Sequence, residues 1–291
     1  MVTTSADKHI PRIEHKVNPI SYELSKDGIT SSGLKFNEFE DKSLEEKEKK
    51  TINPKSVANV FIQEIIKFSK TGAKGTVDQP KGLMESDPQR LVQMLKSLCE
   101  DVKKLLMSES HCLSIASPVV VVGDIHGNIE DLLTIENTLS ISKLIPTSKY
   151  LYLGDYVDRG KWSVECAVYL LSLKVLSPQN IHLLRGNHEV RELQEFFTFK
   201  EECTAKYGPQ NRVYHLLNDV FDCLSVSAVV DDTIFCCHGG IPSSVHTIRE
   251  IQAIPKPLRD PSAVECLPAH ELLWNDPSTQ ESYEATIELV G

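Results

Sequence analysis

Residues 119–127 read VVVVGDIHG, an apolar run that ends in a polar cluster containing two glycines. Three later stretches repeat this arrangement: YLYLGDYVDRG at 150–160, IHLLRGNHE at 181–189 and IFCCHGG at 234–240. Short apolar runs bounded by turn residues are typical of buried strands. The sequence therefore predicts four buried strands, each followed directly by polar side chains.

Helical stretches lie around these strands at Ile129–Leu139, Ser163–Leu173 and Val213–Leu224. Because strands alternate with helices, we expect an α/β fold built in layers. Ligands of such sheets gather at the carboxyl ends of the strands, so all four polar clusters are expected at one edge. The run Val226–Val230 predicts a further strand, joined by a tight turn at Asp231-Asp232 to the strand that follows.

The first 52 residues differ in composition from the rest of the chain. They are rich in Ser, Thr, Lys and Glu, and they carry too little apolar surface to offset the entropy cost of ordering. Helical periodicity begins after Asn53, and a second helix is expected at Asp87–Met107, with Ser86 or Asp87 available as its N-cap. The sequence thus predicts a poorly ordered tail at residues 1–52 and one globular domain at residues 53–291.

Composition excludes several classes of function. The formal net charge is -10, whereas a protein that binds duplex nucleic acid needs a basic surface, so no nucleic-acid partner is expected. The eight cysteines form no CxxC pair and are expected to be reduced thiols. No run of 18 apolar residues occurs, which argues against membrane spanning. An intracellular location, cytoplasmic or nuclear, is the expectation.

The four clusters bring together a set of oxygen and nitrogen donors without a thiolate. Such a set favours Mn²⁺, iron or Zn²⁺ in an open hydrolytic site over a closed structural zinc site. The donors are Asp124, His126, Asp155, Asp158, Asn187, His188 and His238. Each has an alternative interpretation when taken alone: Asp124 as a helix cap, the histidines as hydrogen-bonded structural residues, Asn187 as part of a turn. Their joint position after successive strands favours a metal site.

These ordered motifs, GDIHG, GDYVDRG, RGNHE and HGG, resemble those of the PPP phosphoprotein phosphatases. The LLWNDP segment at Leu272–Pro277 agrees, and the resemblance extends over Val57–Pro277. Type 1 and type 2A enzymes and their protozoan relatives are the most similar, without a choice among them. The resemblance implies a calcineurin-like metallophosphoesterase fold, a layered β-sandwich flanked by helices, and hydrolysis of phosphoserine and phosphothreonine.

The resemblance also implies a role for each donor. Asp124 and His126 would hold a first divalent metal ion, Asp155 would bridge two ions, and Asn187 and His238 would hold the second. A bridging carboxylate offsets the repulsion between two cations, which together lower the pKa of a bridging water. Mn²⁺ is the expected metal, with iron and zinc as alternatives.

By the same resemblance, Arg159 would clamp the phosphate oxygens together with Asn187 and His188, since a guanidinium offers a planar fork of donors. His188 would be the general acid that protonates the leaving oxygen, and Asp158 would orient its ring. A competing interpretation makes His188 a metal ligand. Glu189 is expected to hold the metal ligands in position without binding a metal ion itself.

The chain departs from the family pattern at its end. That pattern continues after the WNDP residues with an Arg-Gly segment, a further metal-binding histidine and a tyrosine, whereas Ser278–Gly291 contains neither arginine nor histidine. His246 and His270 lie upstream of the place where the last ligand belongs. We therefore expect the second metal to lack a ligand, the C-terminal strands to be missing, and activity to be low unless another segment or partner completes the site.

Three functions remain open at this level. The first is an active protein phosphatase, with phosphoproteins as substrates and regulatory subunits as partners. The second is a weakly active or silent relative that binds phosphoproteins or regulatory subunits. The third is a metallophosphoesterase that acts on nucleotides.

Overall fold

The computed structural model describes residues 23–25, 28–30, 55–71, 82–84, 86–139, 149–263 and 266–277. Most of the tail predicted at residues 1–52 and the whole segment 278–291 lie outside these residues, so the expectations about order in the tail and about missing C-terminal strands stay predictions. The chain divides into two compact units, Met1–Thr51 and Ile52–Gly291. In the first unit, β1 (Glu23–Ser25) pairs antiparallel with β2 (Gly28–Thr30).

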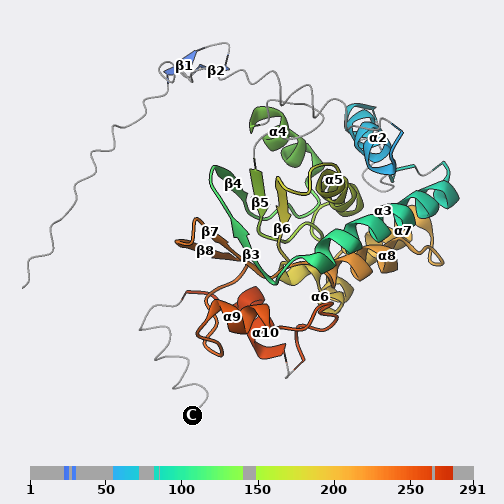
Figure 1. Cartoon of the computed structure of the whole chain (residues 1–291). Helices are drawn as coiled ribbons and strands as arrows, with labels where there is room; N and C mark the ends of the chain where they lie inside the picture. Colours follow the sequence, from blue (N-terminus) through green and yellow to red (C-terminus); the bar gives the residue numbers. More distant parts are fainter. Residues whose placement is uncertain are drawn as a thin grey trace, which may run out of the picture. The chain divides into compact units, whose positions relative to one another are not determined.

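The first sheet of the larger unit carries three of the four motifs. It consists of β4 (Val119–Val122), β5 (Lys149–Tyr152) and β6 (Ile181–Leu183), which run parallel in that order. The strands predicted at these positions are confirmed. Since the strands are parallel, the residues that follow all three emerge at the same edge (Figure 1).

The second sheet contains β3 (Cys112–Ile115), β7 (Ser227–Val230) and β8 (Ile234–Cys237). β3 is parallel to β7, and β7 pairs antiparallel with β8. The predicted tight turn is confirmed, with Asp231 at φ 49° and Asp232 at φ 53°. The sequence analysis missed β3, whose short apolar run precedes the first motif.

The hydrophobic cores define the layers. Leu113 of β3, Leu151 of β5 and Ala228 of β7 pack in one buried cluster, so the two sheets face each other. The outer face of the second sheet packs against residues from α9 (Ile248–Gln252) and α10 (Leu267–Trp274). The predicted layered sandwich with flanking helices is therefore confirmed.

The largest core cluster lies between the first sheet and the helices. Its members come from α2 (Val57–Thr71), α3 (Pro88–Ser108), α4 (Ile129–Leu139), α5 (Ser163–Leu176), α7 (Phe199–Tyr207) and α8 (Val213–Phe221). Every residue of α5 from Ser163 to Lys174 is buried, as expected for a helix covered on all sides. Asp87 caps α3 as predicted, since its carboxylate accepts a hydrogen bond from the Arg90 N–H. Among the described residues, no helix is long and apolar enough to span a membrane.

Two features of the strand prediction are wrong. Val121 of β4 is 48% exposed and Ile234 of β8 is 58% exposed, because both strands are edge strands in the described sheets. In addition, β8 belongs to the second sheet and not to the sheet of the other three motifs. Its following residue, His238, nevertheless lies close to the residues that follow the first sheet.

Candidate metal centre

The Asp155 carboxylate lies at the middle of the predicted donor set and is almost fully buried. Its Oδ2 lies 3.3 Å from Nε2 of His126 and 3.9 Å from Nε2 of His188. Its other oxygen, Oδ1, lies 3.3 Å from Nε2 of His238. One carboxylate thus contacts donors that follow β4, β6 and β8, with each of its oxygens facing a different imidazole.

Two groups of potential metal ligands share this carboxylate. One contains His126, Asp155 and His188, and the other contains Asp124, Asp155 and His238. Asp124 also lies near the first group, since its Oδ2 is 3.7 Å from Nε2 of His126. The convergence expected for residues that follow the strands is therefore present in the structure.

Two further observations show that this donor set fits divalent cations. Nδ1 of His126 pairs with the Val157 carbonyl at 2.9 Å, which makes Nδ1 the protonated nitrogen and leaves the Nε2 lone pair facing Asp155. The side-chain oxygen of Asn187 is buried and has no hydrogen-bond partner among the described residues. A buried acceptor of this kind is costly unless a ligand satisfies it.

Glu189 holds the loop that carries Asp155. Its carboxylate accepts the backbone N–H groups of Asp155 at 2.7 Å, Tyr156 at 2.8 Å and Gly186 at 3.0 Å. Burial, and then the neighbouring Asp155 carboxylate, raise the pKa of Glu189. Cations bound at Asp155 would oppose this effect, so the supporting role expected for Glu189 agrees with its contacts.

The backbone around the site adopts unusual conformations. Positive φ angles occur at His126 (45°), Asp155 (56°), Asp158 (68°) and Arg159 (63°), which costs about 1–3 kcal/mol at each non-glycine residue. Such strain persists only where the surrounding structure enforces it, and the Glu189 hydrogen bonds do so for the Asp155 loop. Side chains rather than local preference therefore set the direction of the donors.

One glycine allows the loops after β5 and β6 to meet. A Cβ atom at Gly186 would lie 2.2 Å from Oδ1 of Asp155 and 2.4 Å from its backbone nitrogen. No larger residue fits there without moving the carboxylate. The glycine of the RGNHE motif is thus needed for the close approach of this loop to Asp155.

Asp158 and Arg159 surround His188. Asp158 is fully buried, and its Oδ2 lies 2.8 Å from Nδ1 of His188. A guanidinium nitrogen of Arg159 lies 3.4 Å from Nε2 of the same ring. The predicted relation between Asp158 and His188 is therefore present, and the arginine lies on the side of the ring that faces away from Asp158.

The sequence analysis missed the residues that hold this pair. Oδ1 of Asp158 accepts hydrogen bonds from the backbone N–H groups of Thr198, at 3.0 Å, and Phe199, at 2.7 Å. These N–H groups lie at the start of α7, where a helix favours an anionic partner. The Phe197 ring packs edge-on against His188 at 4.7 Å and lies 5.7 Å from the Arg159 guanidinium. No motif signals these contacts, because two of them use the backbone.

Arg185 of the RGNHE motif is a structural residue. Its guanidinium is fully buried and donates to the carbonyls of Glu189, at 2.9 Å, and Leu258. Burial lowers the pKa of Arg185 to about 10, so the side chain remains charged at neutral pH. The arginine therefore ties the short helix Asn187–Glu189 to the loop that precedes α10.

The structure decides some of the alternative roles of single residues. Asn128, and not Asp124, caps α4, since its Oδ1 accepts the Asp131 N–H at 3.1 Å. His246 and His270 belong to neither ligand group. The His270 ring instead stacks on Trp274 at 6.0 Å. Asn187 begins the turn that places His188 beside Asp155, and its own role as a ligand stays a prediction.

The parallel sheet, the opposed second sheet and a carboxylate shared by two ligand groups define a metallophosphoesterase type of centre. The family of calcineurin-like phosphoesterases matches residues 117–290, and the chain belongs to this family. Members of this family act through divalent metal ions, and the two ligand groups provide a candidate place for them.

Curated relatives agree with the PPP resemblance. The chain is 41% identical over 194 residues to the serine/threonine-protein phosphatase PP2A-like PPG1 of Saccharomyces cerevisiae, covering 67% of this chain and 50% of that protein. It is 44% identical over 186 residues to the putative serine/threonine-protein phosphatase C22H10.04 of Schizosaccharomyces pombe, covering 63% of this chain and 58% of that protein. The chain thus spans about half the length of the curated relatives it matches.

A solved structure shares the fold. It is a protein serine/threonine phosphatase from Saccharomyces cerevisiae with similarity to human phosphatase PP5, with a TM-score of 0.58 and 28% identity. The match covers 64% of this chain and 59% of that one. The predicted family and fold class are therefore confirmed.

Proposed function

We propose that this chain carries the catalytic centre of a serine/threonine phosphoprotein phosphatase. The observation that supports this proposal most directly is the position of Asp155, whose two oxygens face His126 and His238 at 3.3 Å each. A carboxylate shared by two ligand groups suits a pair of cations in hydrolysis of a phosphate ester. The names of the two curated relatives, both serine/threonine-protein phosphatases, favour protein substrates over nucleotides.

The proposed ligands form two sets that share Asp155, and these sets follow the family pattern and not the two groups found by distance, in which His188 lies with His126 and Asp124 lies with His238. Asp124 and His126 complete the first set, and Asn187 and His238 complete the second. Two bound divalent cations, for which Mn²⁺ is proposed with iron and zinc as alternatives, would supply Lewis acidity and lower the pKa of a coordinated water. The chain's own contribution is to hold carboxylate, carboxamide and imidazole donors in one pocket before any ion arrives.

His188 is the proposed general acid. Because Nδ1 faces the Asp158 carboxylate at 2.8 Å, that nitrogen keeps a proton and donates a hydrogen bond to Asp158. Nε2 is then the atom that can hold and deliver a second proton, and it faces the Arg159 side of the pocket. The leaving seryl or threonyl oxygen would receive this proton as the phosphate ester breaks.

Arg159 is the proposed phosphate clamp. Its guanidinium lies beside Nε2 of His188, so phosphate oxygens held by its planar fork would place the leaving oxygen near the acid. The Phe197 ring supports the guanidinium through a cation–π contact. Regulatory subunits are proposed as partners on the basis of the family resemblance alone.

Hydrolysis of a phosphothreonine peptide with added Mn²⁺ tests the proposal. We expect His188→Ala to lower kcat by about a hundredfold or more, because it removes the general acid. His246→Ala is the matched control, since that exposed histidine belongs to neither ligand group. Equal rates for wild type and His188→Ala would refute the catalytic role, and elemental analysis that finds no bound metal would refute the proposed centre.

A further inference from the structure

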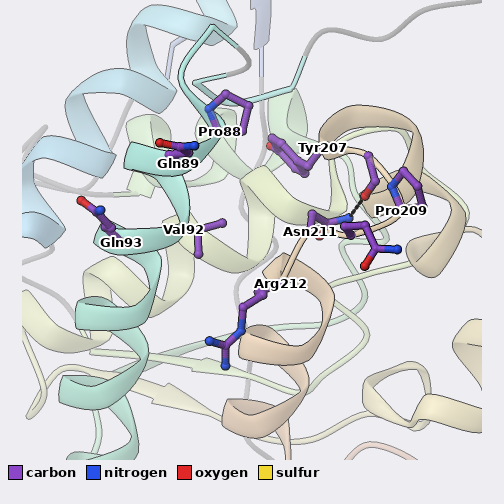
Figure 2. A pocket seen from close by; sticks show the side chains of 10 residues that line it. Pro88, Gln89, Val92, Gln93, Tyr207, Pro209, Asn211 and Arg212 are labelled. Atoms are coloured by element: carbon purple, nitrogen blue, oxygen red, sulfur yellow. Dashed lines mark hydrogen bonds between the residues drawn. The ribbon is translucent and has the colours of Figure 1, made fainter.

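A second pocket lies away from the metal centre, between the first turns of α3 and the loop that joins α7 to α8. Its volume is about 500 Å³, and none of its lining residues belongs to either ligand group (Figure 2). Volumes of this size are typical of sites that bind drug-sized ligands. The lining residues are Pro88, Gln89, Val92, Gln93, Tyr207, Gly208, Pro209, Gln210, Asn211 and Arg212.

Hydrogen bonds hold the loop wall of this pocket in place. On the loop side, the Asn211 side chain donates to the carbonyl of Cys203 at 3.0 Å and accepts the Val213 N–H at 2.9 Å. Gly208 ends α7 with φ 85°, and its N–H bonds to the Thr204 carbonyl. A ligand would therefore meet a pre-formed surface, which reduces the cost of ordering the site on binding.

The pocket combines apolar surface with a free cation. Val92, Tyr207 and Pro209 provide apolar walls, and no lining residue is acidic. The Arg212 side chain is exposed and has no hydrogen bond or ion pair to any residue that the structure describes. A guanidinium binds carboxylates through paired hydrogen bonds, so this arginine favours an anionic group on the ligand.

The remaining polar groups suit a polypeptide backbone. Gln89 and Gln93 are exposed on α3, four residues apart and hence on the same face of the helix. Each carboxamide can both donate and accept a hydrogen bond, as a peptide group can. An extended peptide can therefore bond to these amides while its side chains reach the apolar walls and Arg212.

The position of the pocket leaves the metal centre free. Tyr207, the last residue of α7, lines the pocket, whereas the first turn of the same helix donates to Asp158. The helix has nine residues, which at 1.5 Å per residue separates its two ends by roughly 13 Å. A ligand in the pocket and a phosphate at Arg159 can thus be bound together.

We propose that this pocket binds a short, extended, acidic peptide segment of a partner protein. An aliphatic side chain of that segment packs against Val92 and Pro209, and a carboxylate pairs with Arg212. Charge complementarity supports an acidic segment, because Arg212 has no ion pair among the described residues and no lining residue is acidic. The proposal does not depend on catalysis, so it can fail or succeed independently of the phosphatase function.

Fluorescence polarisation with two labelled tetrapeptides on the full chain tests this site. The probes are acetyl-Leu-Asp-Leu-Glu-amide and its neutral analogue with Asn and Gln in place of the acids. We expect the acidic probe to bind about tenfold more tightly than the neutral probe, and Arg212→Gln to remove that difference. Gln93→Glu should weaken the acidic probe alone, because it places a carboxylate in the lining.

Arg249→Gln is the matched control, since it removes the same charge from an exposed residue outside the pocket. Equal binding of the two probes, wild-type binding by Arg212→Gln, or absence of binding up to about 1 mM would each overturn the proposal. Sedimentation is run on the same samples. Self-association that Arg212→Gln abolishes would assign the pocket to a second copy of the chain and also overturn the proposal.

Discussion

Replacing His111 by glutamine should make the unfolding free energy less sensitive to acid. His111 precedes β3 and is only 2% exposed, and its Nε2 pairs with the Pro255 carbonyl at 3.1 Å. Burial, and then the nearby Lys256 ammonium, lower the pKa of His111 from 6.5 to about 4. A glutamine amide can still donate to Pro255 but cannot take up a proton.

The sign and size of the effect follow from this pKa. Because the folded-state pKa lies below the unfolded value, the unfolded chain takes up the proton first as the pH falls. The stabilisation from a neutral His111 is therefore present above pH 6.5 and is lost as the pH falls towards 4. The slope of the unfolding free energy reaches its full value of about 1.4 kcal/mol per pH unit only once the pH is below 6.5, where the unfolded chain is protonated. The loss between pH 7 and pH 5 is therefore about 2 kcal/mol.

Urea denaturation of wild type and His111→Gln between pH 7 and pH 5 measures this loss as a difference. A difference is needed because the raised pKa of buried Glu189 makes the unfolding free energy rise as the pH falls, which opposes the effect of His111. This contribution is the same in both proteins and cancels in the difference. His215→Gln, at an exposed position on α8, is the matched control and should follow the wild type. If the curves for wild type and His111→Gln run parallel over this range, the assigned burial effect is wrong.

Three further outcomes are expected. Lys206→Met should destabilise the protein by about 3–5 kcal/mol in thermal denaturation, because it leaves the buried carboxylates of Glu165 and Glu202 without their cation. These carboxylates lie 2.8 and 2.9 Å from Nζ of Lys206. Lys200→Met, at the exposed lysine of the same helix, is the control and should melt like wild type. Gly160→Ala should weaken Mn²⁺ binding in calorimetry, since its Cβ would lie 2.0 Å from the His126 carbonyl oxygen, and unchanged affinity would contradict this. Mn²⁺ at a hundred times its Kd should raise the unfolding free energy by about 2.7 kcal/mol, and a chelator should reverse the gain.

The strands and the donors that follow them could be predicted because their signals are local. Each apolar run and its polar cluster are contiguous, as in residues 119–127, so the strand and the donor that follows it appear in one short window. The exposure of Val121 and Ile234 could not be predicted in the same way, because it depends on which strands lie at the sheet edges. Edge position is a property of pairing between distant segments, which the composition of one run does not carry.

The hydrogen bonds that hold the site residues in place could not be predicted from the sequence. Thr198 and Phe199 contact Asp158 through backbone N–H groups, so their side-chain identities give no signal. The pocket beside α3 presents the same difficulty, since Gln89 and Arg212 lie far apart in sequence and belong to no motif. Only the packing of α3 against α8 brings these two segments together.

The contacts of Glu189 explain why the metal ligands and their support occur in one motif. Its carboxylate binds the N–H groups of Asp155 and Tyr156, while Asn187 and His188 lie one and two residues before it. A shift of the loop after β6 would therefore move the Asp155 carboxylate, the candidate ligand Asn187 and the candidate acid together. Because one residue couples these positions, the distances between them are set by the fold before metal or substrate binds, which is the preorganisation that two-metal hydrolysis needs.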